Sequence, residues 1–169
     1  MSDKNATEQE LMEKKLENGL KAQSGSGMDP PSNHMELEGE LCKLFYRRFG
    51  EGALPIIAEV FRSWGLVLGR RTKDKLSNVS FKVALEAYFQ PVTAREPKPE
   101  IIEFTEKKAK VKVFNCPYRL NGAGIALCEA MTSMDRAFLE VLLDGNIELE
   151  LRESLASGDP YCLAILSRK

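Results

Sequence analysis

Apolar residues recur every three or four positions from residue 36 to residue 90, which is the spacing of amphipathic helices. The pattern predicts a first helix over 36–50 and a second that begins at Pro55 and ends with Gly69 as its C-terminal cap. A third helix is predicted over 73–90, with Pro91 ending it. We therefore expect the domain to open with helices. The apolar stripe of the second is formed by Ile57, Val60, Phe61, Trp64 and Leu68.

After residue 99 the apolar period shortens to that of β-strands. Ile102 and Phe104 begin one predicted strand. Residues 108–113 form another, in which lysines alternate with small apolar residues, so that one face is charged and the other apolar. Strands are also predicted over 147–152 and 161–166, and a long helix over 122–143 separates them from the earlier pair. The fold class is therefore α+β, with N-terminal helices followed by a small, mostly antiparallel sheet on which one long helix packs.

Residues 1–34 differ in composition from the rest of the chain. They are strongly polar and contain a Ser-Gly repeat at 24–27 followed by Pro30 and Pro31, which is typical of a linker. Such a segment buries too little apolar surface to offset the entropy of ordering it. We expect a disordered or loosely docked tail over 1–34, dispensable for the fold, and a single α+β domain over 35–169.

Composition and charge narrow the class of protein. The chain has 169 residues and is 43% hydrophobic and 29% charged, so a core of normal size can form. Its net charge is −1, and without a basic excess a nucleic-acid partner is not expected. We find no run of about 20 apolar residues and no secretory leader, which predicts a cytoplasmic protein without a membrane partner. The four cysteines lack a CxxC pair and are expected to be free thiols.

One carboxylate stands in the apolar stripe of the 122–143 helix. Asp135 falls on the same face as Cys128, whereas Glu129, Arg136 and Glu140 lie together on another face. A carboxylate in that position loses hydration and needs a partner. Two interpretations stay open: Asp135 belongs to a functional site, or it caps a backbone group or pairs with an arginine for structural reasons.

Two more cysteines lie at the ends of predicted elements. Cys116 follows the lysine-rich strand directly before Pro117, and Cys162 opens the last strand. Element ends are where side chains reach a cleft at the edge of a sheet. Together with Cys128 and Asp135 they predict a cysteine cluster with one carboxylate, although each thiol alone is also compatible with core packing.

The loop before the long helix contains Arg119, Gly122 and Gly124. Glycine N–H groups at a helix N-terminus favour a carboxylate or phosphate, with Arg119 assisting. A plain tight turn is the alternative. Dinucleotide binding is not expected, because Leu127 replaces the third glycine of the fingerprint and no parallel βαβ unit surrounds it.

The order of these residues resembles that in a known family. The matching features are Asn115-Cys116-Pro117, Cys128 with Asp135 seven positions on, and Ser157-Gly158-Asp159-Pro160-Tyr161-Cys162. Over about 36–169 the chain resembles the L-2-amino-thiazoline-4-carboxylic acid hydrolase-like family, and its C-terminal end is similar to the 4-vinyl reductase-like domains that bind small molecules. The resemblance implies a hydrolase that opens a thiazoline-type ring of a carboxylate-bearing substrate at a carbon–nitrogen bond.

Two functions follow as expectations. In the first, Asp135 activates water or a thiol, one of Cys116, Cys128 and Cys162 is the nucleophile, and the substrate is held by Arg119, Gly122, Gly124 and Asp159. This enzyme requires no cofactor. In the second, the domain binds a small molecule or a soft metal such as zinc without catalysis, the three cysteines being the metal ligands if there is one.

Overall fold

The computed structural model describes residues 30–93 and 96–169. The chain divides into two units, Met1–Pro31 and Ser32–Lys169, and every element with described bounds lies in the second. The predicted tail over 1–34 falls almost wholly outside the described residues. The second unit begins three residues before the predicted position 35, because Asn33 caps its first helix: Asn33 Oδ1 accepts hydrogen bonds from the N–H groups of Met35 (3.0 Å) and Glu36 (3.1 Å).

Helices α2 (His34–Phe49) and α3 (Ala53–Lys73) follow each other through the short 3₁₀ turn η1 (Gly50–Gly52). The first helix is confirmed to within two residues. The second is longer than predicted, and the assignment of Gly69 as its cap is wrong: the helix continues to Lys73 with Asp74 at its C-cap. Gly69 instead lies on a buried row that repeats every four residues along α3, comprising Ala53, Ile57, Phe61, Gly65 and Gly69.

This buried row of α3 packs along helix α5 (Ile125–Leu142). The two helices approach so closely that a Cβ on Gly65 would lie 2.2 Å from the carbonyl oxygen of Met134. A Cβ on Gly69 would lie 2.8 Å from the Cβ of Val141. The glycines of α3 are therefore contact positions for a neighbouring helix, not terminators.

Helix α4 (Phe81–Thr93) differs most from its prediction. It begins eight residues later than position 73, with Ser80 Oγ accepting a hydrogen bond from the N–H of Val83 (3.3 Å) in its first turn. It also continues past Pro91, so the prediction that this proline ends the helix is wrong. A proline in the last turn removes a single helical hydrogen bond, which a packed helix tolerates.

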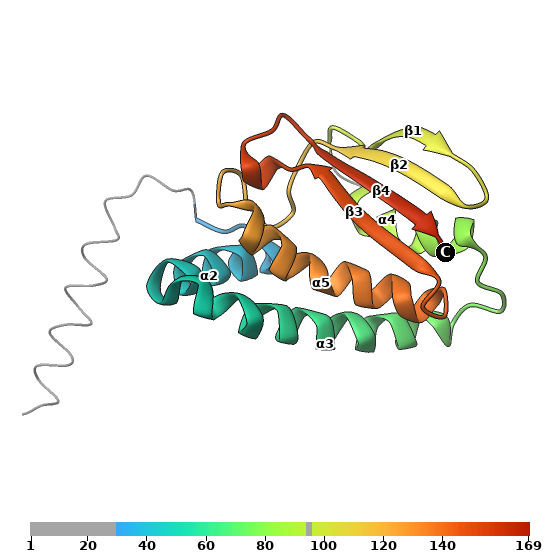
Figure 1. The fold of residues 1–169 in the computed structure, drawn as a ribbon, viewed down its shortest axis with the longest axis horizontal. Helices are drawn as coiled ribbons and strands as arrows, with labels where there is room; N and C mark the ends of the chain where they lie inside the picture. The colour runs from blue at the N-terminus through green and yellow to red at the C-terminus, as the bar shows by residue number, and fades with distance from the viewer. Residues whose placement is uncertain (1–29, 94–95) are drawn as a thin grey trace, which may run out of the picture. The chain divides into compact units, whose positions relative to one another are not determined.

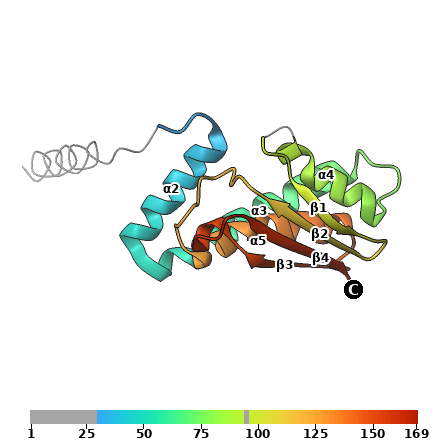
Figure 2. The same ribbon diagram turned by 90° about the horizontal axis from the view of Figure 1, so that it is seen from above.

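The sheet contains β1 (Glu100–Phe104), β2 (Lys108–Val113), β3 (Ile147–Glu153) and β4 (Cys162–Arg168) in the order β1-β2-β4-β3, and all neighbours are antiparallel. Figures 1 and 2 show α5 lying across one face of this sheet, with α3 on the far side of α5. The α+β prediction is confirmed.

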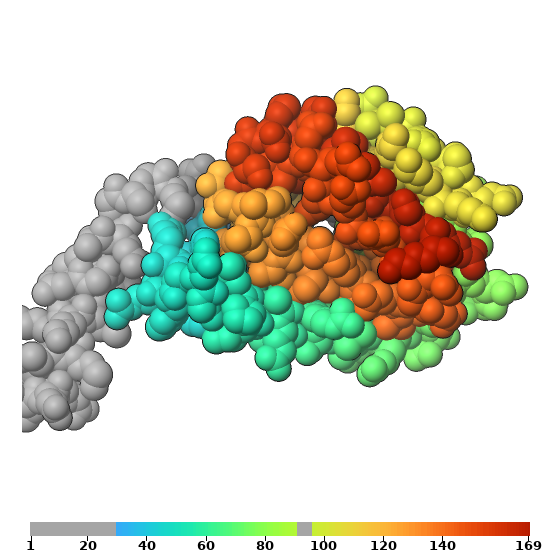
Figure 3. Space-filling model, in the orientation of Figure 1, coloured from blue at the N-terminus to red at the C-terminus, as the bar shows by residue number. Residues whose placement is uncertain are grey.

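The core consists of two apolar clusters joined along α5. One lies between the sheet, α4 and the C-terminal half of α5, and includes Leu139 and Leu166. The other lies between α2, α3 and the N-terminal half of α5, and includes Phe61 and Leu127. The space-filling view shows the atoms of β3 and β4 on one side of α5 and those of α3 on the other (Figure 3).

Candidate functional site

A cavity of about 350 Å³ lies where the two clusters meet. Its wall is mostly apolar and comes from the helices α2, α3, α4 and α5, the strands β2, β3 and β4, and the loop that follows β2. A volume of this size with a few polar groups is typical of small-molecule sites. The polar or titratable side chains in the wall are those of Thr72, Tyr88, Gln90, Asn115, Cys116, Tyr118, Cys128, Thr132, Asp135 and Cys162.

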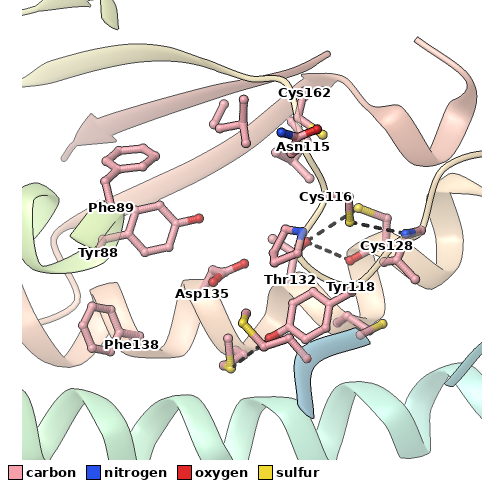
Figure 4. A pocket seen from close by; sticks show the side chains of 18 of the residues that line it. Tyr88, Phe89, Asn115, Cys116, Tyr118, Cys128, Thr132, Asp135, Phe138 and Cys162 are labelled. Atoms are coloured by element: carbon pink, nitrogen blue, oxygen red, sulfur yellow. Dashed lines mark hydrogen bonds between the residues drawn. The ribbon is translucent and has the colours of Figure 1, made fainter. Parts of the chain in front are cut away.

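All four residues predicted to form the centre of a site line this one cavity: Cys116, Cys128, Asp135 and Cys162. Cys116 comes from the loop after β2, Cys128 from the first turns of α5, Asp135 from the middle of α5, and Cys162 from the start of β4. The structure thus brings together side chains that are far apart in the sequence (Figure 4). The chemical roles assigned to them stay predictions.

Asp135 is the acidic group of the cavity. Its side chain is half-buried and lines the cavity. Burial raises the pKa of its carboxyl group from 3.8 to about 7. The neighbouring Arg136 lowers the pKa only in part. Within residues 30–93 and 96–169 we find no hydrogen bond or ion pair to this carboxylate. Asp135 is therefore a carboxyl group that ionises near neutral pH and whose oxygens are open to a ligand.

Two tyrosines flank this carboxyl group, and neither was identified from the sequence. Tyr88 of α4 and Asp135 of α5 direct their oxygen atoms into the same space (Figure 4). The pKa values of Tyr88 and Tyr118 are raised by burial and, next, by the nearby Asp135. Both phenols are therefore neutral at physiological pH and can donate a hydrogen bond. The Tyr118 hydroxyl donates to the Met134 sulfur at 3.9 Å.

The cysteine sulfurs accept hydrogen bonds from the turns that close the site. The N–H of Leu120 donates to Cys116 Sγ at 3.4 Å, and that of Leu155 donates to Cys162 Sγ at 3.4 Å. Ser154 Oγ lies 3.6 Å from Cys128 Sγ and is placed to donate to it. These contacts connect the loop after β2 and the 3₁₀ turn η2 (Leu155–Ser157) to the cavity wall.

Burial also sets the protonation state of two of these thiols. It raises the pKa of Cys116 and that of Cys162, although backbone N–H groups oppose the shift in both cases. At neutral pH both side chains are therefore thiols, which are weak nucleophiles and weak metal ligands. In the described part of the chain no group of three or more His, Cys, Asp or Glu side chains is arranged to hold a metal ion. The geometry thus gives no support to a zinc or other soft-metal site at Cys116, Cys128 and Cys162.

Alkylation of the native protein tests this assignment. We expect iodoacetamide to modify Cys116 and Cys162 more slowly than free cysteine at about pH 7, with rates that rise steeply as the pH approaches 9. Cys42, whose pKa burial raises to about 11, should be slower still. Mass spectrometry of peptides from timed reactions measures each rate separately. Fast modification of Cys162 that does not change between about pH 6 and 8 would reveal a thiolate and favour a nucleophilic role.

The residues predicted to hold a substrate carboxylate do not line the cavity. The guanidinium of Arg119 forms an ion pair with Glu36 at 3.0 Å. The N–H groups of Gly122 and Gly124 donate to the carbonyl oxygens of Leu155 and Ala156, each at 2.9 Å.

The fourth of these residues, Asp159, likewise has a structural contact. Its Oδ2 accepts a hydrogen bond from the N–H of Ser154 at 2.7 Å. The contacts of these four residues therefore connect the loop before α5 to α2 or to the η2 turn, or stabilise the η2 turn itself. The alternative of a tight turn describes this loop better than an anion site does.

Comparisons with known proteins leave the family open. No family model matches the chain, and no curated protein matches it. Among solved structures, it is similar to a trafficking protein particle complex subunit 3 from Naegleria fowleri covalently bound to palmitic acid. That match has 13% sequence identity and a TM-score of 0.44, and it covers 79% of this chain and 96% of the other. What the cavity can bind is therefore inferred from its own geometry.

Proposed function

We propose that this protein binds a small, mainly apolar molecule that carries a basic nitrogen, and that Asp135 receives this nitrogen. The observation that carries the proposal is a carboxyl group without a described hydrogen-bond or ion-pair partner, facing a mostly apolar cavity between two neutral tyrosines. The apolar wall favours an apolar ligand body through the hydrophobic effect, and the few polar groups orient it.

The preference for a basic nitrogen follows from charge. A buried carboxylate is unfavourable unless a cation or several donors compensate it, and a protonated amine supplies both a charge and N–H groups. Among the described residues of the cavity wall there is no lysine, arginine or histidine. A ligand carboxylate would therefore enter a site that has one acidic group and no cation, which costs free energy. The cavity should select amines against acids.

Three probes with the same ring test this selectivity: naphthylmethylamine, naphthylmethanol and naphthylacetate. By calorimetry at about pH 8 we expect the amine to bind best and the carboxylate worst. Between about pH 6 and 8 the affinity for the amine should rise about tenfold, because the Asp135 carboxyl with a pKa near 7 loses its proton in this window. At about pH 6 amine binding should release a proton, which is measured in buffers of different ionisation enthalpy.

Two results would contradict the proposal. Equal affinities for amine and carboxylate at about pH 8 would contradict the role of Asp135 while leaving a general apolar site. Absence of binding by all three probes would contradict a small-molecule site of this ring size. The alcohol is the matched control, since its affinity should change little with pH.

Ring-opening hydrolysis is the second candidate, and one observation favours it. A carboxyl group with a pKa of about 7 is well placed to act as a general base near neutral pH, because it is ionised and still basic. In this reaction Asp135 would take a proton from a water as the water oxygen bonds to the C=N carbon, and would pass it to the ring nitrogen. The second proton of the water would reach the same nitrogen through Asp135 as the C–N bond breaks and a C=O group forms, so that the carboxylate is regenerated. The phenol of Tyr88 would donate a hydrogen bond to the reacting group. Incubation with 2-amino-thiazoline-4-carboxylate, followed by NMR of the ring protons, tests it. Turnover that Asp135→Asn abolishes would support catalysis. If the substrate stays unchanged, the hydrolase proposal is contradicted and only the binding proposal remains.

A further inference from the structure

The aromatic side chains of the cavity gather around its carboxyl group. Among the described residues of the wall the aromatic ones are Tyr88, Phe89, Tyr118 and Phe138, and we call them the aromatic wall. Figure 4 shows Tyr88, Phe89 and Phe138 on one side of Asp135 and Tyr118 on the other. The rings come from α4, from α5 and from the loop after β2, so three separate segments of the chain supply them.

The rings on the α4 side pack against one another. The ring centroids of Tyr88 and Phe89 lie 4.7 Å apart at an interplanar angle of 64°, and those of Tyr88 and Phe138 lie 6.5 Å apart at 36°. All three rings also pack against the apolar cluster between the sheet, α4 and α5. Each member of the aromatic wall is half-buried and lines the cavity, so part of its surface is open to a ligand. The rings are thus positioned by the fold before a ligand enters.

Aromatic rings around a carboxylate favour a particular kind of cation. The face of an aromatic ring is electron-rich and attracts a cation, most strongly where water is excluded. A primary ammonium is compact and strongly hydrated, and it loses this hydration when it enters an apolar cavity. Each N-methyl group replaces one N–H group with apolar surface that a ring can cover. An N-methylated ammonium therefore fits the aromatic wall better than a primary ammonium does.

The carboxylate limits how far this methylation can go. In the described part of the chain the oxygens of Asp135 have no hydrogen bond or ion pair. The Tyr118 hydroxyl donates to the Met134 sulfur at 3.9 Å. The Tyr88 hydroxyl is directed into the space in front of the carboxylate and can serve one of its two oxygens (Figure 4). The other oxygen needs a donor from the ligand, because a buried carboxylate without donors is unfavourable. One N–H group must therefore remain on the ligand nitrogen.

We propose that the ligand of this cavity is a tertiary ammonium compound that donates its single N–H to Asp135 and places its N-methyl groups against the aromatic wall. This inference rests on the proposed binding of a basic nitrogen and narrows the class of amine. Two N-methyl groups covered by rings should raise the affinity about tenfold over the primary amine. A trimethylammonium keeps the charge but has no N–H, so it should bind several-fold more weakly than the dimethyl form.

Calorimetry on the full chain with a methylation series tests the proposal. The probes are naphthylmethylamine and its N,N-dimethyl and N,N,N-trimethyl forms, measured at about pH 8, where the Asp135 carboxyl is ionised, and corrected for the protonated fraction of each amine. A dimethyl form that binds no more tightly than the primary amine would overturn this inference, as would a trimethyl form that binds as tightly as the dimethyl form. If the primary amine still exceeds naphthylacetate, the proposed function stands and only this inference fails. Equal affinities of primary amine and naphthylacetate would contradict both.

Leucine variants separate the attraction of a ring for a cation from simple apolar contact. Tyr88→Leu and Phe138→Leu should each weaken the dimethyl form several-fold more than they weaken the neutral naphthylmethanol, whereas Tyr88→Phe keeps the ring and should restore most of the loss. Phe114→Leu is the matched control, since Phe114 is also half-buried but packs on Tyr161 outside the cavity wall, with ring centroids 6.1 Å apart.

Circular dichroism establishes that each of these variants is folded, and the methylation series on the wild type needs no variant at all. Equal losses for the dimethyl amine and the alcohol in both leucine variants would show that the rings act as apolar surface alone, and would overturn the role of the aromatic wall.

Discussion

Replacing Gly65 with alanine should destabilise this protein by more than about 3 kcal/mol or prevent it from folding. The new methyl group would lie 2.2 Å from the carbonyl oxygen of Met134 and 2.9 Å from two further backbone atoms of the same residue. Backbone atoms in the middle of α5 can yield only if α3 and α5 move apart. Such a movement would open the packed row of α3, including Ile57 and Phe61, and would create voids along it.

Gly52→Ala is the matched control for this prediction. Gly52 precedes α3, has a backbone φ of −61° that alanine adopts readily, and has nothing within 4 Å of the position of the added Cβ. We expect Gly52→Ala to leave the free energy of unfolding within about 1 kcal/mol of the wild type, or to raise it. Urea unfolding followed by circular dichroism measures both variants. Equal stabilities of the two variants would show that α3 and α5 are not in the close contact described.

The same glycines explain one error of the sequence-based prediction. A glycine near the end of an apolar helical pattern is compatible with a C-terminal cap or with close approach of another helix, and the sequence contains no feature that separates the two. At Gly69 the close contact with Val141 shows that the glycine accommodates a neighbouring helix and does not cap α3. The residues that face α5 recur every four positions, but two of them are glycines, so they do not stand out in an apolar pattern.

Strands were easier to locate than helix boundaries, because a half-buried strand shows its two faces directly in the sequence. The alternation in β2 matches its burial, with Ala109 and Val111 buried and the lysines on the other face. The start of α4 was misplaced because Leu76 and Val79 continue an apolar pattern while lying in the connection before it. Both pack against the core from that connection, and the spacing of apolar residues does not distinguish such a connection from a helix.

The candidate site could be predicted only in part. Asp135 stood out as a single charge in an apolar helical stripe, and its position in the cavity wall follows from that stripe. Tyr88 gave no such signal, since a tyrosine on an apolar helix is ordinary core material. Its role depends on α4 and α5 meeting across the cavity, and that packing is a tertiary property. Arg119 was assigned to the site by its loop, whereas its ion pair with Glu36 directs it away.

Asp135→Asn is expected to make the protein more stable at about pH 8 and to remove most of its affinity for the amine probe. The carboxyl has a pKa of about 7 in the folded protein, against 3.8 ordinarily, so the folded state holds this proton more tightly than the unfolded chain does. The contribution of Asp135 to the stability of the wild type must therefore fall as the pH rises from about 4 to about 7. Asparagine has no proton to lose, and its free energy of unfolding should lack this decline.

The difference between variant and wild type should consequently grow across that window and become constant above about pH 8. Its size there should be on the order of 2–4 kcal/mol, reduced by the cost of burying an amide that has few partners. In the same variant the affinity for naphthylmethylamine should fall by a factor on the order of 10², the usual scale for removing one partner of a buried charge pair, while naphthylmethanol should bind almost as before.

Asp144→Asn is the control, because Asp144 has an 80% exposed side chain that pairs with Lys73 Nζ at 2.6 Å on the surface. Its backbone φ of 52° is one that asparagine tolerates, so the exchange should change stability by less than about 1 kcal/mol at any pH. Urea unfolding at several pH values and calorimetry with the two probes measure both effects. An Asp135→Asn variant that is less stable than the wild type at about pH 8 and still binds the amine normally would show that Asp135 supports the fold, and that the ligand is held by other groups of the cavity.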